Sequence, residues 1–367
     1  MTTPPSQKST LHYKLLNGTT PISFDVYFPD PISPIVISTD SESGPIPIPV
    51  VIYFHGGGLC VGNRESWFPT WLYRRVISLG YAFLSADHRL LPPATGHEIV
   101  QDLKDLFYFL STTEVSIHPY KFKLDTNKIA VSGSSAGGLC AYLAAMHCSP
   151  KPKAIVSMYG MGGNFLTPHY FTPKEKPFFR GRDLLDPADF SDYLYPFPNG
   201  PLPPLSESHL AYHPQTYRIP GYPANKRMLL SRLYLQLGVY LDYYTGMHQP
   251  SLSLSLRQHT VEDTPGRLVA PEHHSLFPQL QMTGENPWPP TMLLHGKLDT
   301  AVPVGESRYL KDLLLSANVP VELVEFDEQE HNFDYQPDAE ERWAEKFDGV
   351  KYFLKKHLGS EAEVILD

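Results

Sequence analysis

The stretch "VSGSSAGG", residues 131–138, decides the fold that the sequence predicts. It contains the pattern G-x-S-x-G between an apolar strand and an apolar helix, which is the context that this pattern requires. On such a sharp turn a serine projects its hydroxyl from strained backbone, and small neighbours avoid a clash with the strand and the helix. The N-terminus of the helix adds a positive dipole that favours developing negative charge. The sequence therefore predicts a nucleophile at Ser135, with Gly133 and Gly137 as its small neighbours.

Apolar strands alternate with amphipathic helices along most of the chain. Strands that are apolar without alternation and are separated by helices indicate a mostly parallel sheet covered on both faces. Asn17-Gly18 joins the first two strands as an antiparallel hairpin. We therefore expect an α/β fold with eight strands, at 12–16, 22–28, 50–54, 81–87, 128–133, 154–160, 291–296 and 320–326, and with early helices near 64–79, 98–111 and 136–147.

A long insertion follows the sixth strand, at residues 161–290, and holds 19 of the 37 prolines. A loop of this length without structure is uncommon, so we expect it to fold as a subdomain. Its segment 225–244 is apolar around most of its circumference and predicts one helix buried between the insertion and the body. We expect a catalytic domain of residues 1–160 and 291–367, with 161–290 as a lid over the site. The alternative is a structural insertion that does not contact substrate.

A serine hydroxyl is a weak nucleophile and needs a base that is held by an acid. In this architecture the chain order is serine, acid, histidine. Asp299 follows the seventh expected strand and His331 follows the eighth, so both lie at the sheet edge where functional side chains gather. We predict Ser135, His331 and Asp299 as a catalytic triad. The weaker candidates are Asp327 and Asp334 as the acid and His295 and His357 as the base.

Three consecutive glycines follow the third strand, in "HGGGLCVGN", residues 55–63. A tight turn needs one glycine, whereas a loop that presents bare N–H groups to a negative charge needs several. Attack on an ester carbonyl places negative charge on its oxygen, and preorganised donors there accelerate the reaction. We predict an oxyanion hole from the N–H groups of Gly57, Gly58 and Ala136. Gly56 supports the loop, and His55 anchors it by hydrogen bonding without taking part in proton transfer.

Composition excludes several classes of protein. The 367 residues carry a formal net charge of −9 and a pI near 6.0, which disfavours nucleic acid or an anionic membrane as the main partner. We find no apolar run long enough for a signal peptide or a membrane span. The three cysteines, Cys60, Cys140 and Cys148, suggest a reducing compartment and no metal site. We expect a cytoplasmic enzyme, monomeric or weakly oligomeric, with no cofactor and no metal.

The motifs "HGGG", "GSSAGG", "HGKLD" and "EHNF" together resemble the hormone-sensitive-lipase-like esterases of the α/β-hydrolase fold. The similarity runs over residues 48–160 and 288–357. "SADHRLLP" is similar to the D-x-R-L-x-P segment of that family, which implies structural roles for Asp87 and Arg89. The chain departs from the family in having Ser134 where Asp is usual and Pro93 where Glu is usual. It also begins with strands, where the family builds its cap from N-terminal helices.

The leading hypothesis is a serine hydrolase that cleaves carboxylic esters of small apolar or aromatic molecules through an acyl-enzyme. A second hypothesis keeps the triad but changes the acceptor, as in a lactonase, acyltransferase or cyclase that acts on a bulky biosynthetic intermediate. A third is a non-catalytic small-molecule receptor resembling the gibberellin receptors, which keep this fold but lose the catalytic histidine. The presence of His331 argues against the receptor. A serine peptidase or amidase is the remaining alternative.

Overall fold

The computed structural model describes residues 4–29, 45–116, 122–258, 265–281 and 288–359. One sheet of eight strands forms its centre, in the order β1-β2-β4-β3-β5-β6-β7-β8. Strand β2 is antiparallel to both of its neighbours, and all other neighbouring strands are parallel, which confirms the mostly parallel sheet. The strands are β1 (Ser9–Leu16), β2 (Thr20–Tyr27), β3 (Ile46–Phe54), β4 (Ala82–Ala86), β5 (Phe122–Ser134), β6 (Ala154–Met158), β7 (Thr291–Gly296) and β8 (Val321–Phe326).

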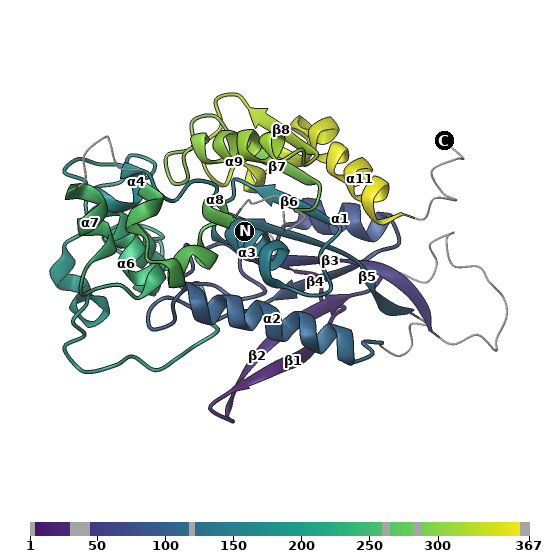
Figure 1. The fold of residues 1–367 in the computed structure, drawn as a ribbon, viewed down its shortest axis with the longest axis horizontal. Coiled ribbons are helices and arrows are strands. Elements are labelled where there is room, and N and C mark those ends of the chain that lie inside the picture. The colour runs from purple at the N-terminus through teal and green to yellow at the C-terminus, as the bar shows by residue number, and fades with distance from the viewer. Residues whose placement is uncertain (1–3, 30–44, 117–121, 259–264, 282–287, 360–367) are drawn as a thin grey trace.

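Helices cover both faces of the sheet (Figure 1). Side chains alternate along a strand, so Ile52 and Val51 of β3 point to opposite faces and belong to separate apolar clusters. The cluster around Ile52 includes side chains of α2 (Gly96–Thr112), α3 (Ala136–His147) and α9 (Gly305–Ser316). The cluster around Val51 includes side chains of α1 (Thr70–Ser78) and α11 (Ala344–Leu358). The short helix α10 (Ala339–Arg342) precedes α11.

The start of the first helix differs from the sequence prediction. We expected a helix from residue 64, but α1 begins at Thr70, directly after Pro69. The preceding residues form a loop in which Trp67 has φ 47° and the Asn63 carbonyl accepts the Ser66 N–H. A positive φ cannot be accommodated within a right-handed helix, so this loop ends before α1 can start.

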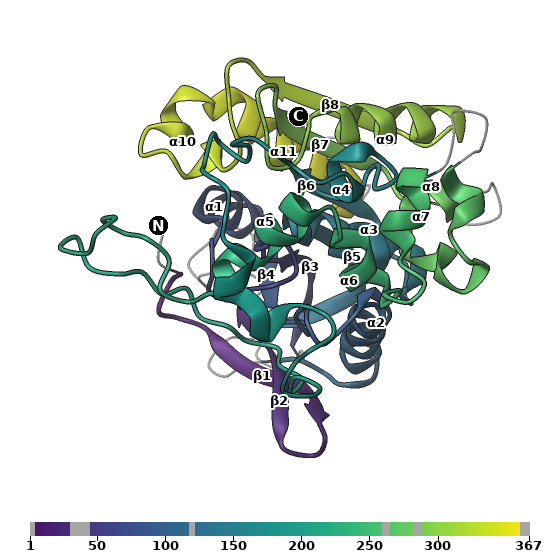
Figure 2. The ribbon, with the colours of Figure 1, turned by 90° about the vertical axis from the view of Figure 1, so that its left-hand side faces the viewer.

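The segment between β6 and β7 folds into short helices, and residues 259–264 and 282–287 within it lie outside the described ranges. Figure 2 shows α4, α5 and α6 in front of the strands. The elements are α4 (Pro168–Phe171), α5 (Arg227–Leu237), α6 (Tyr240–Thr245), α7 (Leu252–Gln258), α8 (Pro278–Gln281) and 3₁₀ turns at Pro187–Tyr193, Pro265–Leu268 and Pro271–Leu276.

The prediction of a single helix over residues 225–244 is wrong, because this segment forms two helices, α5 and α6. Gly238 adopts a left-handed conformation, with φ 64° and ψ 37°, which ends α5 before α6 begins. A Cβ atom at this position would lie 2.6 Å from the backbone nitrogen of Pro173. The break therefore depends on glycine for both its backbone conformation and its packing.

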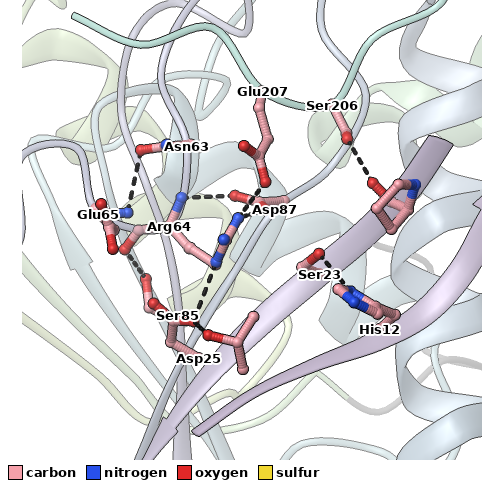
Figure 3. A network of polar contacts seen from close by, with 12 residues as sticks. His12, Ser23, Asp25, Asn63, Arg64, Glu65, Ser85, Asp87, Ser206 and Glu207 are labelled. Atoms are coloured by element: carbon pink, nitrogen blue, oxygen red, sulfur yellow. Dashed lines mark hydrogen bonds and ion pairs between the residues drawn. The ribbon is translucent and has the colours of Figure 1, made fainter. Parts of the chain in front are cut away.

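A buried ion-pair network fastens the inserted segment to the body (Figure 3). The Arg64 guanidinium lies 3.1 Å from Asp25 on β2 and 2.5 Å from Asp87 after β4, and it also pairs with Glu207 of the inserted segment. Asp87, for which the family resemblance implied a structural role, thus helps to hold this junction. The other residue with such an implied role, Arg89, pairs with Asp102 at 2.8 Å.

A second arginine also joins the two parts, but it belongs to the inserted segment and donates hydrogen bonds to the body. Arg227, the first residue of α5, is buried and donates to the carbonyl oxygens of Cys60, Leu91 and Pro92 at 2.9, 2.7 and 2.9 Å. Cys60 belongs to the glycine-rich loop after β3, and the two other carbonyls belong to the loop after β4. Helix α5 is therefore hydrogen-bonded to two loops of the body.

Candidate active site

Ser135 lies on the sharp turn between β5 and α3 that the sequence predicts. Its backbone has φ 54° and ψ −122°, which is strained for a residue with a side chain. Glycine is needed on both sides of it. A Cβ atom at Gly133 would lie 2.1 Å from the Gly137 carbonyl oxygen, and one at Gly137 would lie 1.9 Å from the Phe54 carbonyl oxygen. The pattern G-x-S-x-G is thus required by close backbone packing around the turn.

The structure brings Ser135, His331 and Asp299 together from the loops after β5, β8 and β7. Ser135 Oγ lies 3.0 Å from His331 Nε2, and His331 Nδ1 lies 2.6 Å from Asp299 Oδ2. Because an ionised carboxylate can only accept, Nδ1–H donates to Asp299 and leaves Nε2 free to accept the serine proton. This is the hydrogen-bond order that a serine nucleophile, a general base and an orienting acid require.

Asp299 is held as an anion by its surroundings. Its Oδ1 accepts the N–H groups of Ala301 and Val302, each at 2.9 Å. Burial alone would raise the pKa of this carboxyl, but the neighbouring imidazoles of His331 and His295 outweigh burial and hold the pKa well below its usual range. The carboxylate therefore stays charged and fixes the orientation of the His331 ring.

The two weaker candidates for the acid do not contact His331 by hydrogen bond. Asp327 is solvent-exposed and pairs with Lys297 at 2.6 Å. Asp334 is buried and accepts from Trp71 Nε1 at 3.0 Å and from the Tyr159 hydroxyl at 2.5 Å. Burial raises the pKa of Asp334 to about 6. Both carboxyl groups therefore have structural partners of their own.

The two weaker candidates for the base are also held elsewhere. His295 is buried, with Nδ1 2.7 Å from Ser307 Oγ and Nε2 2.8 Å from the Val302 carbonyl oxygen. His357 lies on α11, where its ring packs against Phe353. Neither imidazole makes a hydrogen bond to Ser135 in the described residues.

The glycine-rich loop lies beside the nucleophile because β3 and β5 are neighbours in the sheet. Gly57 and Gly58 have φ 106° and 60°. A Cβ atom on Gly57 would lie 2.1 Å from the Val61 carbonyl oxygen, and one on Gly58 would lie 2.2 Å from Ser231 Cβ. No hydrogen bond between described residues takes the N–H of Gly57 or Gly58. Both N–H groups are therefore unpaired among the described residues, and both glycines line the cavity beside Ser135.

The remaining predicted loop residues are also close to the site. Ala136 is the first residue of α3, so its N–H is at the helix N-terminus. A Cβ atom on Gly56 would lie 3.4 Å from Ser135 Cβ, which shows how closely the loop approaches the nucleophile. His55 Nδ1 donates to the Gly56 carbonyl at 2.7 Å, and its ring stacks on His88. Burial, and to a lesser extent the neighbouring ring of His88, lower the pKa of His55 to about 3, so the His55 ring is neutral.

A cavity of about 560 Å³ opens beside Ser135 and His331. Its wall includes Trp67 from the loop after β3. The inserted segment contributes the apolar side chains of Met161, Phe179, Pro223, Met228, Leu229, Leu235 and Tyr240. Tyr240 of α6 is part of this wall. Leu233 is not: it is fully buried on α5 and is absent from the cavity wall.

The cavity wall also contains residues that sequence reasoning missed. Arg180, Arg182 and Arg232 line it, and among the residues that the structure describes no aspartate or glutamate does. In the sequence, Arg232 is one polar residue within the apolar segment 225–244, and the apolar pattern does not indicate whether its side chain faces solvent or a cavity. The paired arginines in "RGRD", 180–183, within a segment expected to cover the site, were the available signal.

Two further observations concern metals and membranes. In the ranges that the structure describes, no group of three or more His, Cys, Asp or Glu side chains is arranged to hold a metal ion. Cys60, Cys140 and Cys148 are buried free thiols. Within those same ranges, every helix is too short or too polar to cross a bilayer.

Sequence comparisons agree with the geometry. The profile of the family "alpha/beta hydrolase fold" matches residues 123–335, and that of the family "BD-FAE" matches residues 37–160. A probable carboxylesterase of Phoma sp. is 28% identical over 82% of this chain and 84% of its own length. A 5-methylorsellinic acid synthase of Aspergillus terreus is 25% identical over 92% of this chain, which spans only 13% of that synthase.

Solved structures share the fold. An esterase from Thermogutta terrifontis superposes with a TM-score of 0.56 at 16% identity, over 97% of this chain and 95% of the other. An esterase from Pyrobaculum calidifontis superposes with a TM-score of 0.54 at 19% identity, over 96% and 87%. Since the family profile covers more than half of the residues and includes both the serine turn and the histidine loop, the chain belongs to the α/β-hydrolase fold family.

Proposed function

We propose that this protein is a carboxylic ester hydrolase that works through an acyl-enzyme on Ser135. The observation that carries the proposal is the chain of hydrogen bonds from Ser135 Oγ to His331 Nε2, at 3.0 Å, and from His331 Nδ1 to Asp299, at 2.6 Å. His331 takes the hydroxyl proton as Oγ attacks the ester carbonyl, and it returns the proton to the leaving alcohol. Water then attacks the acyl-enzyme with His331 again acting as the base.

The glycine-rich loop completes this mechanism. The tetrahedral intermediate carries a negative oxygen, which the N–H groups of Gly57, Gly58 and Ala136 stabilise. The positive φ values of the two glycines and their unused N–H groups support this role. Donors that are already oriented need no reorganisation during the reaction, so their contribution falls on the rate of the chemical step.

The relatives support the same reaction class, since one is named a probable carboxylesterase. Within this proposal the body, 1–160 and 291–367, supplies the catalytic groups. The insertion, 161–290, acts as a lid that shapes the substrate cavity. The side chains that it contributes to the cavity wall, among them Tyr240 and Leu235, support that division.

A fluorophosphonate probe tests the proposal directly, because it labels only an activated serine. We expect stoichiometric labelling of the wild type at Ser135, located by peptide mass spectrometry, and no labelling of Ser135→Ala. Labelling elsewhere, or none, would rule out an enzyme that uses this serine and would favour a receptor on the same fold. Comparing a phenyl ester with the matching anilide separates an esterase from an amidase.

A second candidate changes only the acceptor of the acyl group. Several relatives are named non-reducing polyketide synthases, and this chain spans only 13–14% of their length. An acyl-enzyme on Ser135 passes its acyl group to an alcohol as readily as to water if the cavity holds that alcohol in place. Product analysis with added alcohols decides: ester or lactone product that exceeds the free acid would replace hydrolysis by acyl transfer or cyclisation.

A further inference from the structure

The cavity beside Ser135 carries positive charge that the hydrolytic machinery leaves unused. Within the described ranges, its wall holds Arg180, Arg182 and Arg232 and no carboxylate. The chain as a whole has 39 acidic residues against 30 lysines and arginines, for a net charge of −9. A wall with three guanidinium groups and no acid thus opposes the charge balance of the protein.

Arg232 is the informative member of the three. It lies on α5, is only 6% exposed, and forms no ion pair with a carboxylate in the part of the chain that the structure describes. Its Nε is buried without a hydrogen-bond partner there. Burial, and then the neighbouring Arg182, lower its pKa, while Tyr222 and Asp183 act in the opposite direction without contacting it. A buried N–H group without an acceptor is unfavourable, and an anionic ligand in the cavity would supply the missing acceptor.

The two other arginines stand at the exposed mouth of the cavity. Both belong to a tight turn closed by the pairing of Phe178 with Arg182. The Arg180 N–H donates to Thr300 Oγ1 at 2.7 Å, next in the chain to Asp299. This bond fastens the turn beside the triad, so its two positive charges attract anions toward the site.

We propose that the natural substrate is an ester that also carries a carboxylate, and that Arg232 binds this carboxylate while Ser135 attacks the ester carbonyl. The inference rests on the proposed function and adds the substrate class. A guanidinium group matches a carboxylate with two parallel hydrogen bonds, which a point charge such as lysine does not provide. Leu229 and Leu235, on the same helix and in the same wall, bind the apolar skeleton of the substrate.

Two pairs of matched substrates test the proposal. The first pair carries the charge on the acyl side, 4-nitrophenyl hydrogen glutarate against 4-nitrophenyl pentanoate. The second carries it on the alcohol side, 4-butanoyloxybenzoate against its methyl ester. The readout is the ratio of kcat/KM for the anionic ester to that for its neutral twin. We expect this ratio to exceed about ten in at least one pair, the size of one hydrogen-bonded charge pair.

Variants on one helix assign the effect. Arg232→Met should lower the ratio by about tenfold. Arg232→Lys should restore only part of it, because lysine lacks the planar fork. Lys226→Met is the matched control: it removes one positive charge just before α5 from an exposed residue that is not in the cavity wall, and it should leave the ratio unchanged. Because Arg232 is buried, the exposed Arg182→Gln serves as the variant that cannot disturb the core, and it should lower the ratio by a smaller factor.

The outcomes are separable. A ratio near one in both pairs, or an equal loss for both esters in Arg232→Met, would overturn the inference and leave the esterase intact. Failure of the wild type to cleave the neutral esters in a manner that depends on Ser135 would overturn the proposed function itself. A salt titration adds a further check. Raising NaCl from about 50 to about 500 mM should lower the wild-type kcat/KM ratio, since salt screens the attraction between the anionic ester and the arginines at the exposed mouth.

Discussion

The side chain of Ser231 fills the space that a side chain at Gly58 would need. A Cβ atom on Gly58 would lie 2.2 Å from Ser231 Cβ and 2.5 Å from Ser231 Oγ, but 3.7 Å from its Cα. The clash is thus with the side chain of α5 and not with its backbone. Gly58→Ala should displace the predicted oxyanion donor and lower kcat by ~10²–10³. Adding Ser231→Gly should recover much of that loss, measured as kcat on a short 4-nitrophenyl ester.

Gly57 gives the matched control for that rescue. A Cβ atom there would lie 2.1 Å from the Val61 carbonyl oxygen, which is backbone. Ser231→Gly should therefore not rescue Gly57→Ala. Equal rescue of both variants would show that Ser231→Gly acts on something other than the clash with Gly58.

Ser135→Ala should reduce ester hydrolysis by ~10⁶ in turnover, as expected for the loss of a triad serine, while leaving the melting temperature close to that of the wild type. The control is Ser132→Ala, which removes a buried hydroxyl from β5, the strand just before Ser135, at a position outside the cavity wall. It should keep activity within a few-fold. Retention of more than a few per cent of activity by Ser135→Ala would remove Ser135 as the nucleophile.

Asp299→Asn should leave Ser135 and His331 in place and slow turnover by ~10⁴, because an amide no longer stabilises the imidazolium or the required tautomer. Asp327→Asn changes an exposed carboxyl that pairs with Lys297 and should keep full activity. The measurement is kcat for a 4-nitrophenyl ester at pH 8. If Asp327→Asn loses as much as Asp299→Asn, the acid is misassigned.

Glu306 on α9 should make stability depend on pH. Burial raises its pKa from the ordinary 4.5 to about 8, so the folded protein keeps a proton that the unfolded chain releases. The proton bound to Glu306 contributes fully to the free energy of unfolding below about pH 4.5. As pH rises from there to about 8, that free energy falls by at most ~1.4 kcal/mol per pH unit. Glu306→Gln keeps one oxygen to accept the Gly162 N–H, its NH₂ group can donate to the Tyr170 hydroxyl oxygen, and it cannot ionise.

Thermal unfolding at a series of pH values checks this. The melting temperature of Glu306→Gln minus that of the wild type should grow between pH 5 and about 8 and then level off. Asp334, whose pKa is also raised, is present in both proteins and cancels in the difference. A difference that stays constant over this range would contradict the buried, protonated Glu306.

Chain-length preference tests the apolar part of the cavity. We expect kcat/KM to rise from acetyl to butyryl esters, since each buried methylene contributes ~0.8 kcal/mol, or about fourfold. Leu235→Ala enlarges the cavity, because Leu235 lines it, and should weaken the dependence of kcat/KM on acyl-chain length. Leu233→Ala, on the same helix but outside the wall, should lower stability and keep the trend. A steady fall from acetyl in the wild type would rule out an apolar acyl site.

The sequence predicted those features that short-range chemistry determines. The serine turn was legible because Gly133 and Gly137 meet backbone atoms at 2.1 and 1.9 Å, so no other residue type fits. Asp299 and His331 were found from their place after apolar strands, since parallel strands bring such loops to one edge. The central parallel strands were found because buried strands of a parallel sheet are apolar throughout, and the antiparallel pair β1 and β2 was found from the turn at Asn17-Gly18.

The features that were wrong or missed depend on contacts between distant segments. The helix expected over 225–244 ran past Gly238 because it was predicted from the apolar pattern alone. A glycine in such a segment often marks the C-terminus of a helix, as Gly238 does here. Leu233 and Leu235 look alike in the sequence, and only the packing of α5 decides which one faces the cavity. Arg232 was not predicted as a cavity residue, because nothing in the local sequence indicates which face of α5 lines the cavity.

The hydrogen bonds of Arg227 have a consequence for engineering and for evolution. One guanidinium group in the insertion satisfies the carbonyl oxygens of Cys60, Leu91 and Pro92, which belong to two loops of the body. A chimaera that exchanged the insertion for one without this arginine would leave three acceptors unsatisfied, one of them in the glycine-rich loop. The insertion is therefore not a transferable module, and its sequence must diverge together with those loops.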